Sequence, residues 1–310
     1  MKILVTGCAG FIGGHVVEKL LADGYDVLGI DCLTYAGDRE LMETLEVKHD
    51  NFKFMTLNIG AIRSDHLANV DLVVNLAAES HVDNSIANSS VFVQTNVVES
   101  HSLIEVCHQS NIPLLHFSTD EVYGVSKTKT FKETDALKPR NPYSATKAAI
   151  DHMIFAYQNT YDFKATLIRP SNNFGPRQNG EKFIPTILRS LQEGKKIPVY
   201  GKGDQIREWT YVKHTAAAVS FLVGKMIGGE CIGEIYNFTT GIDMTNIEMV
   251  TRICDGIGVS VNDSVEHVED RLGHDFRYSI TAKKLEKAGF KVDADIEKEL
   301  QETILFYEGK

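Results

Sequence analysis

Two groups of reactive side chains lie about twenty residues apart near the middle of the chain. In the second group, Tyr143 and Lys147 are four residues apart, a spacing that places two side chains on one face of a helix. An ammonium beside a phenol favours the ionised phenol, whose pKa is otherwise near ~10. The pair therefore predicts a base that removes a hydroxyl proton while a hydride leaves the same carbon.

Adjacent carboxylates form the first group, within residues 118–124 (STDEVYG). Asp120 and Glu121 supply an acid and a base that the oxidation of an alcohol alone does not need. A carboxylate pair after a strand is most often part of a solvated loop, and it is Tyr143 and Lys147 that favour the catalytic interpretation. Together the two groups predict an enzyme that oxidises a sugar and then eliminates water from it.

The composition excludes several other classes of protein. The 310 residues are 43% apolar and 24% charged, as in soluble globular proteins, and the net charge of −10 argues against nucleic-acid or membrane partners. Five cysteines without a CxxC spacing predict reduced thiols rather than a disulfide or zinc framework, and no metal site is expected. No signal peptide is recognisable, and the apolar run 216–223 is too short to cross a bilayer, so we expect a cytoplasmic protein.

Short apolar runs alternate with segments of helical periodicity through the first half of the chain. This alternation predicts an α/β protein with a Rossmann-type, doubly wound parallel sheet. The predicted strands cover residues 3–6, 27–30, 52–57, 72–76, 114–118 and 165–169, and the predicted helices cover 11–22, 90–110 and 143–161. Beyond residue 170, prolines punctuate a looser pattern that predicts a smaller mixed α/β lobe.

A glycine-rich turn follows the first predicted strand. Gly7, Gly10 and Gly13 form a GxxGxxG pattern, which permits a tight turn and points the next helix at a pyrophosphate. Asp31 ends the second predicted strand, where a carboxylate binds the ribose hydroxyls of adenosine and repels a 2′-phosphate. The turn and Asp31 together predict NAD rather than NADP as the cofactor.

Several longer motifs extend the pattern along the whole chain. They occur at residues 31–37 (DCLTYAG), 78–83 (AESHVD), 171–176 (SNNFGP), 181–185 (EKFIP), 203–211 (GDQIREWTY) and 271–278 (RLGHDFRY). With these motifs, the chain resembles the extended short-chain dehydrogenase/reductases that act on nucleotide sugars. Within that group it is most similar to the nucleotide-sugar 4,6-dehydratases, above all those acting on dTDP-glucose.

The resemblance implies a substrate and a role for each reactive residue. The substrate is a nucleoside-diphosphate (NDP) glucose, and the product is its 4-keto-6-deoxy derivative. Tyr143 takes the O4 proton, Lys147 lowers the pKa of Tyr143 and binds the nicotinamide ribose, and Thr119 hydrogen-bonds O4. Glu121 then removes the C5 proton, while Asp120, kept protonated, donates a proton to the departing 6-hydroxyl.

The resemblance also implies the binding residues. For NAD the matching positions are Gly7, Gly10, Phe11, Ile12, Gly13, Asp31, Cys32, Leu33, Thr34, Asn58, Ile59, Leu76, Ala77, Ala78, Ser80, Thr95, Tyr143, Lys147 and Asn173. For the nucleotide sugar they are Ser80, Asp120, Glu121, Asn172, Asn173, Lys182, Phe183, Pro198, Tyr200, Arg207, Asn246, Arg271 and His274. Arg207 and Arg271 match arginines that clasp the diphosphate, for which a planar guanidinium is suited.

The same resemblance implies two domains and a homodimer. Residues 1–170 are expected to bind NAD and carry the catalytic residues. Residues 171–310 are expected to form mainly the nucleotide-sugar lobe, with crossings back to the first domain. The helices predicted at 90–110 and 143–161 resemble those that pair in a homodimer. No nucleic acid or membrane partner is expected.

Three positions depart from the family pattern. Asn58 stands where Asp is usual near the adenine amine, and an amide oxygen can still accept that hydrogen bond. Cys32 stands where Lys or Arg is common, and Leu272 where Pro is common. The nucleotide base stays open at this point: thymine, uracil or cytosine.

Two groups of related enzymes and one class of regulator are the alternatives. NDP-sugar 4-epimerases and UDP-glucuronate decarboxylases share the cofactor motifs and the Tyr/Lys pair. Epimerases typically carry small hydroxyl residues in place of Asp120 and Glu121, and decarboxylases typically lack the Asp. A non-catalytic NAD-binding regulator would tend to lose Tyr143 or Lys147. The four residues together therefore favour dehydration.

Overall fold

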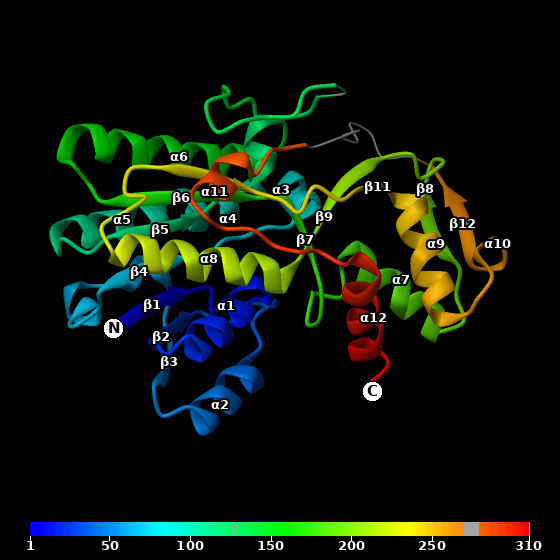
Figure 1. Cartoon of the computed structure of the whole chain (residues 1–310), viewed down its shortest axis with the longest axis horizontal. Coiled ribbons are helices and arrows are strands. Elements are labelled where there is room, and N and C mark those ends of the chain that lie inside the picture. The colour runs from blue at the N-terminus through cyan, green and yellow to red at the C-terminus, as the bar shows by residue number, and fades with distance from the viewer. Residues whose placement is uncertain (127, 270–278, 310) are drawn as a thin grey trace.

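A parallel sheet forms the centre of the larger of two lobes (Figure 1). The computed structural model describes residues 1–126, 128–269 and 279–309. Within these residues the sheet has seven strands in the order β10-β6-β5-β4-β1-β2-β3, and every pairing is parallel. Its strands are β1 (Lys2–Thr6), β2 (Asp26–Asp31), β3 (Phe52–Thr56), β4 (Leu72–Asn75), β5 (Leu114–Phe117), β6 (Ala165–Pro170) and β10 (Ile235–Phe238). The predicted Rossmann-type fold is confirmed.

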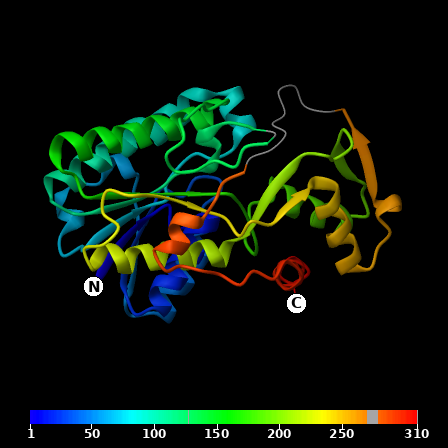
Figure 2. The same ribbon diagram turned by 45° about the horizontal axis from the view of Figure 1, so that its top comes forward.

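Helices cover both faces of this sheet, as Figures 1 and 2 show. One face carries α1 (Phe11–Ala22) and α8 (Val212–Ile227), and the other carries α5 (Ser100–Gln109) and α6 (Pro142–Tyr161). Alternate residues of each strand enter the two cores, because successive side chains of a strand point to opposite faces. Ile3 and Val5 of β1, for example, belong to the first core and Leu4 to the second.

The chain order reverses at β1, which lies between β2 and β4. Loops that leave neighbouring strands in opposite directions open a crevice at the carboxyl edge of the sheet, where α/β proteins bind their ligands. Helical segments follow β2, β3 and β4. They are α2 (Arg39–Lys48), η1 (Ile59–Ala61), η2 (Ser64–Leu67) and α3 (Val82–Ala87).

The helix α6 carries the predicted base and begins one residue before its predicted start. Asn141 caps it by accepting a hydrogen bond from the Ser144 backbone N–H at 2.8 Å, and Pro142 occupies the first turn, where its missing N–H costs nothing. The other predicted helix, over 90–110, is divided into α4 (Ser89–Val93), a π-helical segment η3 (Gln94–Glu99) and α5. Such π-segments are frequent at functional sites.

The smaller lobe packs around its own apolar core. A three-stranded sheet in the order β11-β9-β7 and a parallel pair β12-β8 form its described strands. They are β7 (Asn172–Phe174), β8 (Ile197–Tyr200), β9 (Ile206–Tyr211), β11 (Asp243–Thr245) and β12 (Val265–Val268). The helices that surround them are α7 (Phe183–Gln192), α9 (Asn246–Ile257), α10 (Val261–Ser264) and α12 (Ile296–Tyr307). Trp209 is buried in this core and stacks on Phe183 with 6.0 Å between ring centroids.

The chain crosses between the lobes several times after residue 170. α8 returns to pack on α1, β10 extends the large sheet beside β6, and the short α11 (Lys283–Lys287) packs near β10. Residues 171–310 therefore contribute to both lobes.

Two general features concern the described part of the chain as a whole. No helix in it has both the length and the apolar character needed to cross a membrane. No group of three or more His, Cys, Asp and Glu side chains within it is placed to hold a metal ion.

Candidate active site

A cleft of about 820 Å³ opens at the carboxyl edge of the large sheet. Most of the predicted NAD positions line this cleft. They are Gly7, Gly10, Phe11, Ile12, Gly13, Asp31, Cys32, Thr34, Asn58, Ile59, Leu76, Ala77, Ala78, Ser80, Thr95, Tyr143 and Lys147. Leu33 and Asn173, also predicted, are not among the lining residues. The volume is large enough for a dinucleotide-sized ligand, and sites of this kind typically enclose several hundred Å³.

The glycine turn brings three pieces of backbone into close contact. Gly7 has φ +66, and a Cβ there would stand 2.6 Å from the Ala77 nitrogen. A Cβ on Gly13 would stand 1.9 Å from the Gly7 oxygen. Only glycine fits at these two positions. The turn therefore packs tightly between α1 and the segment after β4, and the N-terminus of α1 remains open to an anionic group in the cleft.

Asp31 is oriented by the backbone around it. One carboxylate oxygen accepts from the Ala9 N–H at 3.0 Å and the other from the Leu33 N–H at 2.8 Å. Burial raises the pKa of Asp31, an effect that these hydrogen bonds oppose. A carboxylate fixed at the end of β2 and lining the cleft suits the paired hydroxyls of an adenine ribose.

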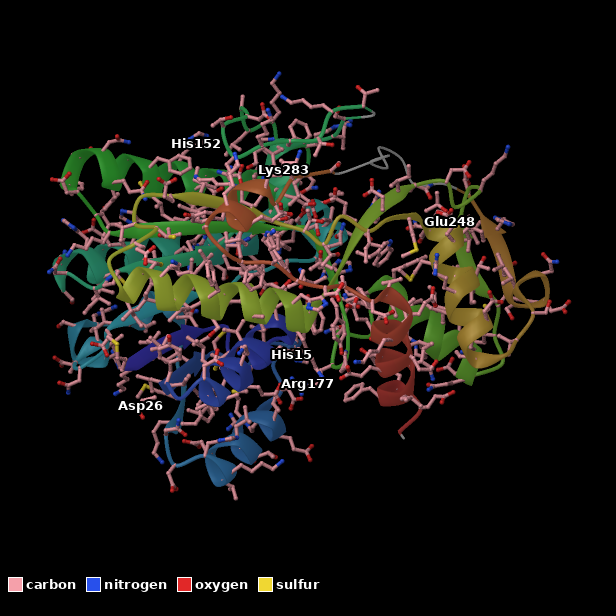
Figure 3. The ribbon with its side chains drawn as sticks, in the orientation of Figure 1. His15, Asp26, His152, Arg177, Glu248 and Lys283 are labelled. Atoms are coloured by element: carbon pink, nitrogen blue, oxygen red, sulfur yellow. The ribbon has the colours of Figure 1, made fainter. Side chains whose placement is uncertain are left out.

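We predict that Asp31→Ala weakens NAD binding by roughly 1–3 kcal/mol, because a charged hydrogen-bond acceptor is lost. Discrimination against NADP should fall at the same time, since no negative charge then opposes the 2′-phosphate. Competition between the two nucleotides for the purified protein, followed calorimetrically, measures both effects. Asp26→Ala is the matched control, because Asp26 is exposed at the opposite end of the same strand (Figure 3). Equal affinity of the unmodified protein for NAD and NADP would contradict the role of Asp31.

The two reactive groups meet where β5 and α6 approach each other. Thr119 follows β5, and Asp120 and Glu121 begin the 3-10 segment η4 (Asp120–Tyr123). The charge of Glu121 and the Thr119 hydroxyl both act on the phenol of Tyr143, which lines the cleft with Lys147. The structure thus brings together all five residues that were predicted to be catalytic.

Asn141 connects the carboxylates to the base and was not predicted. Its side-chain amide donates to Glu121 Oε2 at 3.0 Å while its carbonyl oxygen caps α6. One residue therefore fixes both the start of the helix that carries Tyr143 and the carboxylate that faces it. The Asn-Pro pair before Tyr143 is a recognisable helix start, but nothing local indicates the contact with Glu121.

The surroundings of Asp120 differ from those of Glu121. Asp120 is 3% exposed, and its pKa is raised well above the usual range by burial, then by the charges of Glu121 and Glu208. Glu121 is partly exposed and accepts the hydrogen bond from Asn141. A carboxyl whose pKa is raised, beside a second carboxyl that is hydrogen-bonded and partly exposed, suits an acid and a base role, in the direction expected for this pair.

Lys147 is not among the main influences on the pKa of Tyr143. Burial and then the charge of Glu121 raise the pKa of Tyr143, although the Thr119 hydroxyl opposes them. The Lys147 amine instead donates to the backbone oxygen of Phe117 at 2.6 Å. Burial lowers the pKa of Lys147 to about 8. The same-face placement of the pair is correct. That Lys147 lowers the phenol pKa stays a prediction, because the Phe117 carbonyl holds the ammonium in this arrangement.

The predicted sugar-nucleotide residues are spread over both lobes. Ser80 and Lys182 line the cleft, and burial lowers the pKa of Lys182. Arg207 acts on the Asp120 carboxyl and lowers its pKa, so it lies within electrostatic reach of the reactive group. The others with described positions belong to the smaller lobe and are not among the residues that line the cleft: Asn172, Asn173, Phe183, Pro198, Tyr200 and Asn246. Arg271, Leu272 and His274 lie outside the described residues.

Contacts between the lobes frame the cleft and were also not predicted. The Tyr35 hydroxyl donates to Glu181 Oε1 at 3.2 Å, and His81 Nε2 lies 3.8 Å from Glu181 Oε2. On the other side, His15 of α1 contacts the Pro176 oxygen at 3.0 Å and the Arg177 guanidinium at 3.1 Å (Figure 3). These contacts hold the loop that follows β7, part of which lines the cleft, against the nucleotide-binding domain.

Comparison with known proteins defines the family. Residues 3–238 match the model of the NAD dependent epimerase/dehydratase family, and the chain belongs to this family. It is 41% identical to the low-salt glycan biosynthesis protein Agl12 of Haloferax volcanii, covering 100% of this chain and 99% of the relative. It is 38% identical to the dTDP-glucose 4,6-dehydratase of Salmonella typhimurium, covering 99% and 92%.

A solved structure shows the same architecture. DesIV, a dTDP-glucose 4,6-dehydratase from Streptomyces venezuelae crystallised with NAD, is 36% identical and has a TM-score of 0.92, covering 100% of this chain and 97% of that one. The expectation of NAD as the cofactor is confirmed by the family. The residues of the cleft fit the cofactor, because the glycine turn leaves room for a pyrophosphate and Asp31 is placed for a ribose.

Proposed function

We propose that this protein is a nucleotide-sugar 4,6-dehydratase that converts NDP-glucose, and dTDP-glucose in particular, into NDP-4-keto-6-deoxyglucose and water. The proposal depends on Asp120 and Glu121, two carboxyls in different surroundings that lie next to the predicted base Tyr143. Burial raises the pKa of Asp120 well above its usual range, and Asn141 holds Glu121 beside Tyr143. An epimerase needs no such pair, because it only removes and returns a hydride at one carbon.

Oxidation at C4 is the first step. Tyr143 removes the O4 proton, and the Thr119 hydroxyl, hydrogen-bonded to the phenol, favours the ionised form. Bound NAD would supply the acceptor for the C4 hydride and the donor for C6, and its positive charge would favour the ionised phenol. Lys147 lines the cleft beside the base, where its ammonium can hold a ribose hydroxyl.

Elimination follows because the C4 ketone makes the neighbouring C5 proton acidic. Glu121 removes that proton, and Asp120 donates its own proton to O6, which leaves as water. The C5–C6 double bond formed in this way is reduced at C6 and protonated at C5, where Glu121 can deliver a proton that it has exchanged with solvent. The sum is the loss of one water, with no net oxidation or reduction.

The remaining residues support binding of a charged substrate. Arg207, whose charge acts on the Asp120 carboxyl, would bind the diphosphate, and Lys182 lines the cleft. The names of the relatives favour thymine as the base. A homodimer formed through α4, α5 and α6, and a cytoplasmic location, complete the proposal.

Incubation with dTDP-, UDP- and CDP-glucose in turn tests the function and the choice of base. Mass spectrometry should detect loss of one water, fastest from dTDP-glucose. A product of unchanged mass with an inverted 4-hydroxyl would identify an epimerase. Loss of carbon dioxide from UDP-glucuronate would identify a decarboxylase.

We further predict that the protein retains NAD through purification, because the reaction regenerates the cofactor in place. Release by heat, followed by chromatography of the supernatant, should yield about one nucleotide per chain. Catalysis should proceed without added NAD and without net NADH. Accumulation of free NADH in proportion to product would instead indicate an ordinary dehydrogenase.

A further inference from the structure

A row of buried polar side chains lies beneath Lys147 and crosses three strands of the large sheet. Thr6, Asn75 and His116 are direct neighbours in the register of β1, β4 and β5, and each is at most 2% exposed. Thr6 Oγ1 donates to Asn75 Oδ1 at 2.6 Å, and Asn75 Nδ2 contacts His116 Nδ1 at 3.1 Å. His116 Nε2 lies 3.5 Å from the Lys147 amine. We call the three residues the polar row.

The sheet itself does not need polar side chains at these positions. Two residues earlier on the same face, the equivalent neighbours are Leu4, Val73 and Leu114, all fully buried in the apolar core. Burial of polar groups is unfavourable unless every one is hydrogen-bonded. The Ala77 N–H donates to Thr6 Oγ1 at 3.4 Å, so the polar row links Lys147 to the loop that follows β4 and lines the cleft.

The hydrogen bonds of the polar row have a direction. As they stand, Asn75 donates to His116 Nδ1, so the neutral imidazole carries its hydrogen on Nε2 and points it at Lys147. That hydrogen suits an uncharged amine. If the Asn75 amide turns over, His116 Nδ1 donates to the amide oxygen, and Nε2 offers a lone pair to a protonated Lys147. The amide and ring orientations are therefore coupled to the charge of Lys147.

We infer that His116 is a positioning residue that sets the charge of Lys147, and through Lys147 the proton transfer at Tyr143. The inference rests on the proposed role of Lys147 beside the base. It assigns His116 no contact with substrate or cofactor. Its imidazole acts as a neutral hydrogen-bond partner whose orientation follows that of Asn75.

The other charged groups around Lys147 agree with this assignment. Asp151, one turn further along α6, favours the charged amine, whereas burial disfavours it, and the pKa of Lys147 stands at about 8. Arg169 of β6 pairs with Asp151 at 2.9 Å and so draws part of that charge away from Lys147. Burial, then the charges of Lys147 and Arg169, lower the pKa of His116, which keeps the imidazole neutral. His116 therefore modulates Lys147 without changing its own charge near neutral pH.

Three substitutions of His116 distinguish this role from simple packing. In His116→Gln the amide can occupy the place of Nε2 and still accept from Lys147. In His116→Asn the amide reaches only toward Asn75, and in His116→Phe both partners are lost. His152→Gln is the control, because His152 lies on the exposed side of α6 (Figure 3). Thermal unfolding of each NAD-loaded variant checks that the fold is kept.

The first measurement is the pKa of Lys147 by NMR of lysine-¹³Cε-labelled, NAD-loaded protein, with the signal assigned through Lys147→Met. In the turned-over orientation His116 Nε2 accepts from the ammonium. We therefore expect His116→Phe and His116→Asn, which lose this acceptor, to lower the pKa by about one unit, a ten-fold change in the protonation equilibrium, and His116→Gln to restore most of it. An unchanged Lys147 pKa in His116→Phe would overturn the inference. This result does not depend on turnover, so it is independent of whether the protein is a dehydratase.

The second measurement is the pH profile of the oxidation step, read as bound NADH after mixing with the accepted nucleotide sugar. At high pH the oxidation rate is limited by deprotonation of the Lys147 ammonium. The oxidation rate of His116→Phe should therefore be close to that of the unmodified protein at low pH and about ten-fold lower above the shifted pKa. A defect of equal size at every pH, or equal rates for His116→Gln and His116→Asn, would mean that His116 only fills space. Failure of the unmodified protein to act on any NDP-glucose would instead count against the proposed function.

Discussion

Tyr143→Phe is expected to lower the rate of the oxidation step by about 10²-fold or more. The variant keeps the ring that lies edge-on to Phe92 and loses only the oxygen that takes the O4 proton. Rapid mixing of the NAD-loaded protein with dTDP-glucose, followed by the absorbance of NADH, measures this step directly. Tyr161→Phe is the control, since Tyr161 is 54% exposed at the far end of the same helix.

The pH dependence of the unmodified protein provides a second test of this base. Burial and Glu121 raise the pKa of Tyr143, so the oxidation rate should increase with pH as the phenol ionises. The increase should end where Lys147 loses its proton, at a pKa of about 8. A rate in Tyr143→Phe within a few-fold of the unmodified protein would show that another group removes the O4 proton.

The strands of the nucleotide-binding domain could be predicted because buried parallel strands are short continuous apolar runs. β1 to β6 begin and end within two residues of the predicted limits. The position of β10 could not be predicted in the same way. Ile235–Phe238 has an ordinary strand pattern, and its pairing with β6 depends on how the chain returns from the smaller lobe.

The same distinction between local and tertiary features applies to the residues of the site. The glycine turn, Asp31 and the spacing of Tyr143 and Lys147 are local patterns, and each maps onto the cleft. Contacts set by register or by packing of the lobes leave no local pattern. The bonds Asn141–Glu121, Asn75–His116 and Tyr35–Glu181 join residues that are between 20 and 146 positions apart.

The raised pKa of Tyr143 could not be predicted for a similar reason. A spacing of four residues shows that two side chains share a face, but it does not show how deeply they are buried or which other groups compete for them. Here the phenol is buried beside Glu121, and the Phe117 carbonyl binds the ammonium. Burial is a tertiary property, and for both groups it is the largest cause of the pKa shift.

Asp120→Asn and Glu121→Gln are expected to separate oxidation from elimination. Both variants keep Tyr143 and Lys147, so the hydride should still leave C4, and bound NADH should accumulate. The 4-keto-6-deoxy product should fall by about 10²-fold or more, because general acid–base catalysis at C5 and O6 is lost. Asp162→Asn is the control, since Asp162 is an exposed left-handed residue at the end of α6, where asparagine is well tolerated.

Two opposite results would contradict the assignment of Asp120 and Glu121 to elimination alone. If Asp120→Asn and Glu121→Gln abolish NADH formation as fully as Tyr143→Phe, the carboxyls take part in oxidation. If product forms at the normal rate, another acid and base serve the elimination.

Isotope labelling then follows the order of events without any substitution. The C5 proton must be lost after C4 becomes a ketone, and it is replaced from solvent, so the product formed in deuterium oxide should carry one deuteron at C5. The hydride from C4 does not exchange with solvent protons and should reach C6 unexchanged. Because burial raises the pKa of Asp120, its carboxyl is suited to donate a proton to O6, which should leave as water in each turnover. A product that keeps O6 and has its C4 configuration inverted would show that Asp120 and Glu121 serve substrate binding rather than elimination.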